Sequence, residues 1–412
     1  MKALKLIMTI ILFANFGQLV YAQSPLDNYL VIAAKNNPLL KAKFNSYLAA
    51  MEKVPQVGTL PDPQVSFGYF ISTPETRVGA QQWNVSLMQK FPWFGLLNAQ
   101  KDAATLFAKA KFEEFNQAKS ELFFSVKETY YKYYFIEKAI AITDKNLKIL
   151  ETIKRLAAIK VEAGIVSLAD VLRIEMEINE LANQLELLKD KKQDLEVKFT
   201  NLLDSAVTIQ IPDSMGVLNF SLDEKMVLDS ILQNNNMVNS IEMRMQAFAS
   251  KEIVAKKMGK PSFSVGIGYT NVANRTDLSP PDNGKDILMF PSVSVSIPIY
   301  RKKYIAMIKE ASLNKQAQEN VLRNTKNTLQ TVFKKNTTEY TDAERRIILY
   351  RKQRILAQKA LDILIVSYST DNKDFDEVLR MERLLLKYQL EEEKAIVDKN
   401  IAVAFTDYLL GK

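Results

Sequence analysis

Bulky apolar residues alternate strictly with small polar residues in four short segments of this chain. The segments form two pairs and predict strands at about 63–72 and 82–92, and at about 261–272 and 289–299. An alternation of period two puts the bulky side chains on one face of a strand and Ser, Gly and Asn on the other. This pattern indicates a barrel with lipid outside and water inside; the alternative is an antiparallel sheet packed on helices in a soluble protein.

The bulky positions of these strands are predicted to face lipid. They are Val65, Phe67, Tyr69, Trp83, Val85, Leu87, Phe263, Val265, Ile267, Val293, Val295 and Ile297. Four strands are too few to close a membrane barrel, which needs about eight, and lipid does not tolerate open sheet edges. Copies of the chain must therefore share one barrel, with eight strands from two copies or twelve from three. A lumen lined by Ser, Gly and Asn favours the water-filled barrel of twelve strands.

Three long runs without Gly or Pro predict unusually long helices. Residues 96–163, 165–211 and 299–410 contain neither residue and are rich in Lys, Glu, Leu and Ala, which favour helix. Apolar residues recur in steps of three, four and seven, which is typical of helices packed side by side over a long distance. Residues that favour turns interrupt the runs near 163–164 and 370–372. We therefore expect two antiparallel helical hairpins, at about 95–204 and about 300–410.

The chain carries the same pattern twice. Asn36-Asn37 returns as Asn234-Asn235, and the first strand returns as the third, both at an offset of 198 residues. The segment 170–173 returns at 377–380, at an offset of 207. Such regularity predicts one supersecondary unit used twice, with a polar Asn-Asn helix, two barrel strands and a long hairpin in each repeat. The repeats are residues 23–215 and 216–412, and the predicted fold class is an α+β membrane protein with an internal two-fold repeat.

The first 22 residues have the pattern of a secretory signal peptide. Lys2 and Lys5 precede an apolar stretch from Leu6 to Phe16, and Val20-Tyr21-Ala22 has the small-residue pattern that signal peptidase cuts. We therefore expect an exported chain that begins at Gln23. No later segment has the roughly 18 apolar residues of a transmembrane helix, which leaves a periplasmic protein, a secreted protein, or one inserted in an outer membrane as strands.

The composition excludes most kinds of catalytic site. The chain has no His and no Cys, which removes the commonest general base, the commonest metal ligand and every Ser/His or Cys/His pair. Phosphate-binding motifs of the GxxxxGK[ST] and GxGxxG types are absent as well. We expect no enzyme activity, no cofactor and no metal site. The basic residues behind the net charge of +8 are interspersed with acids along helices, which indicates solvated faces and no nucleic-acid binding.

The order of these features resembles the TolC family of outer-membrane efflux channels. The residues that carry the resemblance lie at 91–95, 164–172, 297–300 and 409–411, within a similarity that extends from about Leu26 to Gly411. The resemblance implies a homotrimer whose twelve strands form one barrel in the outer-membrane lipid of a Gram-negative cell, and whose helices form a periplasmic tunnel. It also implies an exit duct that docks onto a periplasmic adaptor (membrane fusion) protein and, through it, an inner-membrane pump of the RND or ABC type.

The resemblance assigns roles to the tips of the two hairpins. The adaptor-docking residues would be Gly164, Ile165, Val166, Ser167, Leu168, Thr370 and Asn372, and the residues of a periplasmic gate would be Asp170, Arg173, Asp371, Asp374, Glu377 and Arg380. Asp170 and Glu377 match an acidic position of the family, where three copies would form a cation-selective ring of carboxylates. The alternative is that both are ordinary acids at a helix N-terminus.

The tips also depart from the family pattern. Arg173 and Arg380 follow the two acids by three residues, and Asp371 stands where a tip glycine is expected. Pairs of an acid and an arginine are therefore a second way to lock the tips.

The resemblance does not single out one cargo. The segments 91–95 and 60–63 look most like the branch of the family that serves heavy-metal efflux, which suggests heavy-metal cations. Multidrug export and type I protein secretion use the same channel architecture and are the alternatives within the family. A periplasmic coiled-coil adaptor or structural protein is the alternative from another class.

Overall fold

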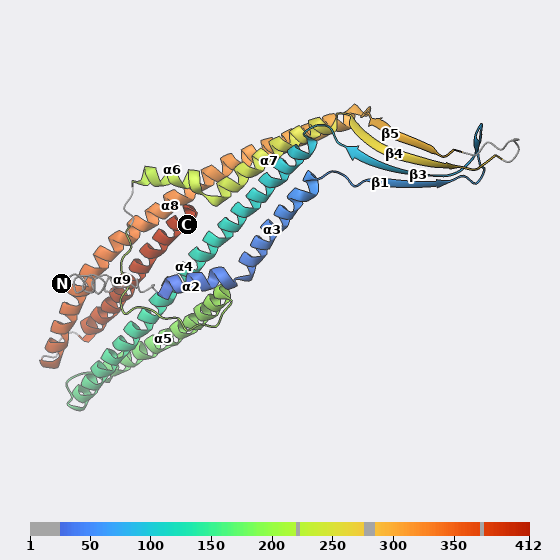
Figure 1. The fold of residues 1–412 in the computed structure, drawn as a ribbon. Helices are drawn as coiled ribbons and strands as arrows, with labels where there is room; N and C mark the ends of the chain where they lie inside the picture. The colour runs from blue at the N-terminus through green and yellow to red at the C-terminus, as the bar shows by residue number, and fades with distance from the viewer. Residues whose placement is uncertain (1–24, 220–222, 276–284, 371–374) are drawn as a thin grey trace, which may run out of the picture.

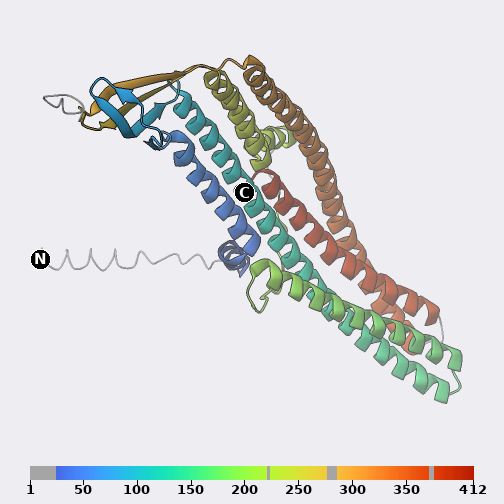
Figure 2. The same ribbon diagram turned by 90° about the vertical axis from the view of Figure 1, so that its right-hand side faces the viewer.

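The strands lie at one end of an elongated molecule, and the long helices extend from them to the other end (Figures 1 and 2). The computed structural model describes residues 25–219, 223–275, 285–370 and 375–412. The expected signal peptide at 1–22 lies outside the described residues, as do Asp371, Asn372 and Asp374 of the expected hairpin tip.

The two halves of the chain pass through the same kinds of element in the same order. The first half contains α2 (Pro25–Asn36), α3 (Pro38–Gly58), β1 (Gln64–Tyr69), β2 (Glu75–Thr76), β3 (Gly79–Phe91), α4 (Leu96–Glu162) and α5 (Leu168–Leu203). The second half contains α6 (Glu224–Asn234), α7 (Asn236–Met258), β4 (Ser262–Val272), β5 (Ile287–Ser296), α8 (Arg301–Thr370) and α9 (Phe375–Leu409). The short strand β2, which pairs with β3, has no counterpart among the described residues of the second half.

The long strands form one antiparallel sheet in the order β1-β3-β4-β5. Residues that pair directly across an antiparallel sheet point to the same side. The apolar pairs are Val65 with Leu87, Phe67 with Val85, Tyr69 with Trp83, Val85 with Tyr269, Leu87 with Ile267, Phe91 with Phe263, Phe263 with Val295, and Val265 with Val293. These bulky positions of the four strands therefore share one face. The other face carries mainly Ser, Gly, Asn and Thr, with Met88 and Lys90 among them.

The strand ends differ from the sequence prediction by up to three residues, and two of the differences affect the expected site. Ile297 was predicted to face lipid from a strand, but β5 ends at Ser296. Pro298 follows and has no N–H group to donate to a neighbouring strand, which explains why the ladder stops there. At the opposite end, β3 begins at Gly79, earlier than the predicted start at about 82, and the short strand β2 pairs with it.

The helices next to the sheet lie side by side in the order α3, α4, α7 and α8 (Figure 2). Farther from the sheet, α5 folds back along α4 and α9 folds back along α8, while α9 also packs against α4 and so joins the two hairpins. Most of the buried residues between them are apolar and come from all four long helices, for example Leu150, Ile174, Leu361 and Leu385. No helix within the described residues is both long enough and apolar enough to cross a membrane.

The paired asparagines mark a break between two helices, which corrects the continuous Asn-Asn helix predicted from the sequence. Asn37 caps α3: its side-chain oxygen accepts a hydrogen bond from the N–H of Leu40 at 3.1 Å, and its Nδ2 donates to the carbonyl of Leu202 at 3.1 Å. Asn235 caps α7 in the same way, and its Nδ2 donates to the carbonyl of Leu409 at 2.9 Å. Each amide therefore satisfies the first turn of one helix and the last turn of another.

Gly411, near the C-terminus, packs closely against the break between α6 and α7. Gly411 has a φ of +78°, and a Cβ atom there would lie 3.0 Å from the carbonyl oxygen of Asn234. A larger residue would be strained both by that backbone conformation and by the contact. This accounts for the glycine of the Leu409–Gly411 ending.

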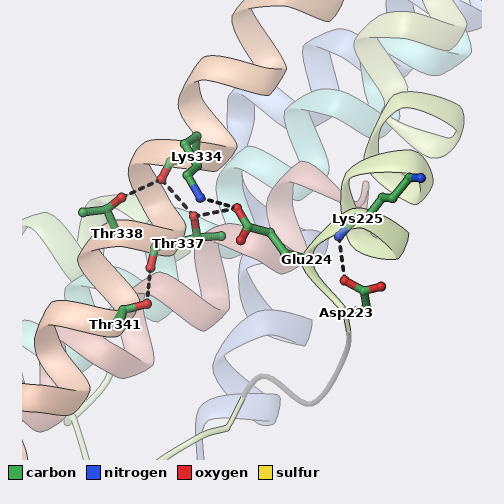
Figure 3. A network of polar contacts seen from close by, with 7 residues as sticks. All are labelled: Asp223, Glu224, Lys225, Lys334, Thr337, Thr338 and Thr341. Atoms are coloured by element: carbon green, nitrogen blue, oxygen red, sulfur yellow. Dashed lines mark hydrogen bonds and ion pairs between the residues drawn. The ribbon is translucent and has the colours of Figure 1, made fainter.

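The helix α6 is held against α8 by a small polar network (Figure 3). Asp223 caps α6 by accepting a hydrogen bond from the N–H of Lys225 at 3.1 Å. Glu224 accepts from Lys334 Nζ at 2.7 Å and from the hydroxyl of Thr337 at 3.4 Å. Both ends of the Lys334–Glu224 pair are more than half exposed, so the network orients α6 more than it stabilises the fold.

Hydroxyl groups of tyrosines in α2 and α4 hydrogen-bond to the backbone of the connection between α5 and α6. Tyr29 donates to the carbonyl of Thr208 at 3.0 Å and accepts from the N–H of Gln210 at 2.9 Å. Tyr134 accepts from the N–H of Met215 at 3.1 Å. These bonds give partners to the backbone groups of a segment that has no helix or strand of its own.

We predict that Asn235→Ala lowers the free energy of unfolding by about 1–2 kcal/mol, because it removes a helix cap and leaves the carbonyl of Leu409 without its donor. The measurement is the urea midpoint of the helical circular dichroism signal. Asn234→Ala is the matched control, since the exposed Asn234 side chain bonds only within its own helix, to Ser230. Equal midpoints for the two variants would show that the cap contributes nothing.

Candidate functional site

The apolar face of the sheet is open to its surroundings. Val65 is 70% exposed, Phe67 69% and Val293 63%, although residues of these types normally lie inside a protein. No helix of the described chain covers this face, since the helices extend away from the end of the sheet (Figure 1). An exposed apolar surface that spans four strands indicates a surface that contacts a protein partner or lipid.

Both edges of the sheet and both edges of the helical layer are also open within one chain. Among the described residues, β1 pairs only with β3 and β5 pairs only with β4. On the outer helices, Phe44 and Leu48 of α3 and Ile305 and Leu313 of α8 are exposed. One copy of the chain therefore leaves polar backbone groups and apolar side chains without partners at its two sides.

The tip of the first hairpin is a tight turn with exposed apolar residues. Gly164 has a φ of +70° and no atom within 4 Å of a Cβ placed on it, so the backbone conformation alone explains the glycine. Ser167 caps α5 by accepting a hydrogen bond from the N–H of Ala169 at 3.1 Å. Ile165 and Leu168 are exposed, whereas Val166 packs against the apolar core between the hairpins.

Three contacts cross between the two hairpin tips. Arg173 of α5 reaches Asp376 of α9 at 3.0 Å and Asp170 of its own helix at 3.5 Å. One turn farther from the tip, Arg383 of α9 pairs with Glu177 of α5.

The third contact joins α4 to α8. Lys160 donates to the backbone carbonyl of Tyr368, and its ammonium lies 4.5 Å from the centre of the Tyr368 ring. Burial, and then the charge of Asp170, raise the pKa of the Tyr368 hydroxyl.

The structure brings only part of the predicted gate together. Asp170 and Arg173 meet at the seam between the hairpins, while Arg380 pairs with Glu377 three residues earlier in its own helix, at 2.6 Å. Thr370 ends α8 and is exposed. Asp371, Asn372 and Asp374 lie outside the described residues.

The residues that complete the crossing pairs were missed by the sequence analysis. The repeat offset of 207 residues does not match these residues with charged partners. It matches Asp376 with Ala169, Glu177 with Leu384, and Arg383 with Met176. A search for features that occur twice therefore could not find them, and no other signal in the sequence marks them.

Glu382 of α9 is buried in the seam between the hairpins. It is 1% exposed, and its Oε1 has no hydrogen-bond partner. Burial and, to a smaller extent, the carboxylate of Glu177 raise the pKa of its carboxyl to about 7, against the opposing effect of the guanidinium of Arg383. A cavity of about 440 Å³ lies beside it, with Leu150 of α4 and Leu181 of α5 in its wall. The seam therefore contains an acid that changes charge near neutral pH.

No metal centre is visible in the described part of the chain. Groups of three or more Asp or Glu side chains with the spacing to hold an ion do not occur there.

Comparison with known proteins agrees with this geometry. Residues 30–204 match the family described as outer membrane efflux protein. The chain is similar to the outer membrane protein VceC from Vibrio cholerae, with a TM-score of 0.78, 16% identity, and 95% of this chain and 97% of that chain covered. No protein in the curated set matches the sequence significantly.

Two further solved structures have the same fold. The MtrE outer membrane channel of Neisseria gonorrhoeae, in its open state, has a TM-score of 0.76 and 16% identity over 94% of this chain and 88% of that chain. CusC, solved in a study of transmembrane channel formation, has a TM-score of 0.74 and 15% identity over 93% of this chain and 91% of that chain. The resemblance predicted from the sequence is confirmed.

We predict that Glu382 makes the seam less stable as the pH rises. Between a pH of 4.5 and about 7, the folded chain keeps a proton on Glu382 that the unfolded chain has already lost. The free energy of unfolding therefore has its full value below a pH of 4.5 and falls as the pH rises to about 7. The loss is at most about 3 kcal/mol. Hydrogen–deuterium exchange of peptides from 378–390, corrected for the intrinsic effect of pH, measures it.

The variant Glu382→Gln should abolish this pH dependence, because its amide does not ionise. Glu175→Gln is the control, since Glu175 is an exposed acid paired with Lys154 at 3.1 Å. An unchanged pH profile in the Glu382→Gln protein would refute the assignment.

Proposed function

We propose that the whole chain belongs to the outer membrane efflux protein family, as residues 30–204 do, and that it works as a passive channel in an outer membrane. Cargo would pass through it from the periplasm, or from an inner-membrane pump, to the outside of the cell. The protein would supply a path and a gate, and would catalyse no reaction.

The observation that carries this proposal is the division of the sheet into two faces. One face is apolar across four strands and exposed, and the other carries mainly small polar side chains, as in the pairs Ser66–Ser86 and Ser264–Ser294, with Met88 and Lys90 among them. A sheet in a soluble protein would cover its apolar face with a core. A sheet with lipid on one side and water on the other needs this arrangement.

We propose a homotrimer, because one chain leaves the sheet open at β1 and β5. Lipid excludes an unpaired sheet edge, so β5 of one copy would pair with β1 of the next. Three copies give twelve strands around a water-filled lumen. The exposed apolar residues on α3 and α8 support the same arrangement, since these helices stand at the two sides of the helical layer and would meet in neighbouring copies to form a periplasmic tunnel.

The hairpin tips are proposed to form the gate at the periplasmic end of this tunnel. They lie at the opposite end of the molecule from the sheet (Figure 1). The crossing pairs Arg173–Asp376 and Arg383–Glu177 would hold the two hairpins of each chain together in the closed state. Charged pairs of this kind can be exchanged for water when the hairpins move apart, which suits a gate better than a permanent apolar seal.

The exposed apolar residues of the tips support docking to a periplasmic adaptor. Ile165 and Leu168 are at the outermost turn and are exposed, which is the usual sign of an interaction surface. The adaptor would connect the duct to an inner-membrane pump of the RND or ABC type. We propose that the pump selects the cargo, whether heavy-metal cations, drugs or secreted proteins, and that the duct only conducts it.

The two faces of the sheet should respond in opposite ways to a charge. Val265→Arg would put a guanidinium into lipid and should cost about 2–4 kcal/mol near the bilayer midplane, whereas Ser264→Arg should assemble and narrow the lumen. The measurement is the fraction of folded oligomer after refolding into vesicles, together with its mass by light scattering. A stable monomer, or equal folding of both variants, would contradict the proposed barrel.

The crossing arginines should control the gate. Replacing Arg173 and Arg383 by Ser removes the pairs between the hairpins, so single-channel conductance in planar bilayers should rise and cells should become more permeable to large antibiotics. Arg380→Ser is the control, because its pair with Glu377 stays within one helix. If the control raises conductance as much as the double variant, the crossing pairs are not the lock.

A further inference from the structure

Basic residues gather where the strands meet the helices. The stretches 77–101, 253–272 and 287–309 contain no Asp or Glu at all. Six cations from two junctions form a group that we call the basic collar: Lys256, Lys257, Lys260, Arg301, Lys302 and Lys303. Basic residues are interspersed with acids along most of the helices, but the acids are absent from these stretches at this end of the sheet.

The fold brings the two halves of the basic collar together. The guanidinium of Arg301, at the start of α8, donates to the carbonyl of Gly259 at 3.0 Å, just after the end of α7. A Cβ atom on Gly259 would lie 3.4 Å from Tyr304, so the two junctions are in close contact. The cations of 256–260 and 301–303 are therefore neighbours in space although about 40 residues apart in the chain.

Within the described residues, few acids offset this charge. Lys256 pairs with Glu252 at 2.6 Å, whereas Lys260, Lys302 and Lys303 are exposed and form no ion pair there. The first turn of α8 holds three cations and no acid. A helix N-terminus carries partial positive charge, so cations are unfavourable at this position by themselves. The arrangement favours binding of an anion from outside the chain.

Aromatic residues place the basic collar at the border of the apolar face. Trp93 stacks on Phe263 of that face, with ring centres 6.1 Å apart, and touches Phe94. Phe94 is 77% exposed, and its carbonyl accepts a hydrogen bond from Lys257 at 3.1 Å. Exposed Trp, Tyr and Phe beside an apolar band are typical of the zone where lipid headgroups lie.

The opposite end of the sheet has a different composition. There the described acids Glu75 and Asp286 offset most of the charge of Arg77, Arg275 and Lys285. The excess of positive charge is therefore larger at the helical end of the sheet, where six cations lie in stretches without Asp or Glu.

We propose that the basic collar binds the phosphate groups of anionic phospholipids in the leaflet on the helical side of the membrane. The inference rests on the proposed membrane function of the sheet. Each exposed cation near a bilayer surface favours anionic over neutral lipid, by about fivefold. The basic collar would thus fix the depth of the strands in the bilayer and orient the helices away from it.

The test compares lipid binding by the full-length protein and a variant. Native mass spectrometry of the detergent-purified protein measures retention of palmitoyl-oleoyl-phosphatidylglycerol against palmitoyl-oleoyl-phosphatidylethanolamine. The wild type should prefer phosphatidylglycerol, and the triple variant Lys260→Ser, Lys302→Ser, Lys303→Ser should lose at least about tenfold of that preference. The control replaces Lys315, Lys335 and Lys352 of α8, which removes the same charge farther along the helix from the sheet.

A second measurement keeps the proposal testable if the triple variant does not assemble. The preference of the wild type for phosphatidylglycerol should fall steeply as salt is raised, because the contact is electrostatic. A preference that ignores salt, or that survives in an assembled triple variant, overturns the proposal. A triple variant that changes the ion selectivity of conductance but keeps the lipid preference shows that the cations face the lumen, which also overturns it.

Failure of the underlying function gives a different result. If the strands do not enter a bilayer, the wild type and both variants will all fail to float with vesicles of phosphatidylethanolamine and phosphatidylglycerol. If only the lipid inference is wrong, all three proteins will float and will bind the two lipids equally.

Discussion

The exposed apolar face of the sheet is the constraint on which the rest of this molecule depends. Four strands present bulky side chains on one side and small polar ones on the other, and no helix of the described chain covers the apolar side. Water disfavours that surface, and lipid disfavours the unpaired edges of the same sheet. The proposed oligomeric barrel, which supplies both lipid and further strands, would satisfy the two conditions.

At the other end of the molecule, the contact between the two helical hairpins combines apolar and polar groups. Two hairpins pack through leucine-rich faces near Leu150, Ile174 and Leu385, yet the seam between them also holds ion pairs and the buried Glu382. A purely apolar seam would be stable but hard to open. Polar groups in a low-dielectric seam cost stability and bring dependence on pH and charge, which is compatible with an element that has to change its state.

The sequence predicted the architecture well because its signals are local and repeated. The alternation at Val65–Tyr69 or Val293–Val295 needs only a period of two, and the long helices need only the absence of Gly and Pro. The outer membrane efflux resemblance followed from the order of these features. Errors arose where one residue interrupts the pattern: Pro298 ends β5 before Ile297, and Asn37 and Asn235 cap helices instead of continuing them.

The sequence by itself determined the strands and the helical hairpins, because both follow from residue type and spacing along the chain. Tertiary structure alone decided which charges meet. Arg173 joins Asp376 and Arg383 joins Glu177 across helices that are about 200 residues apart, and Arg301 brings one basic segment to another at Gly259. Spacing cannot reveal such pairs, since they depend on how two hairpins and two junctions pack, and packing is set by the whole fold.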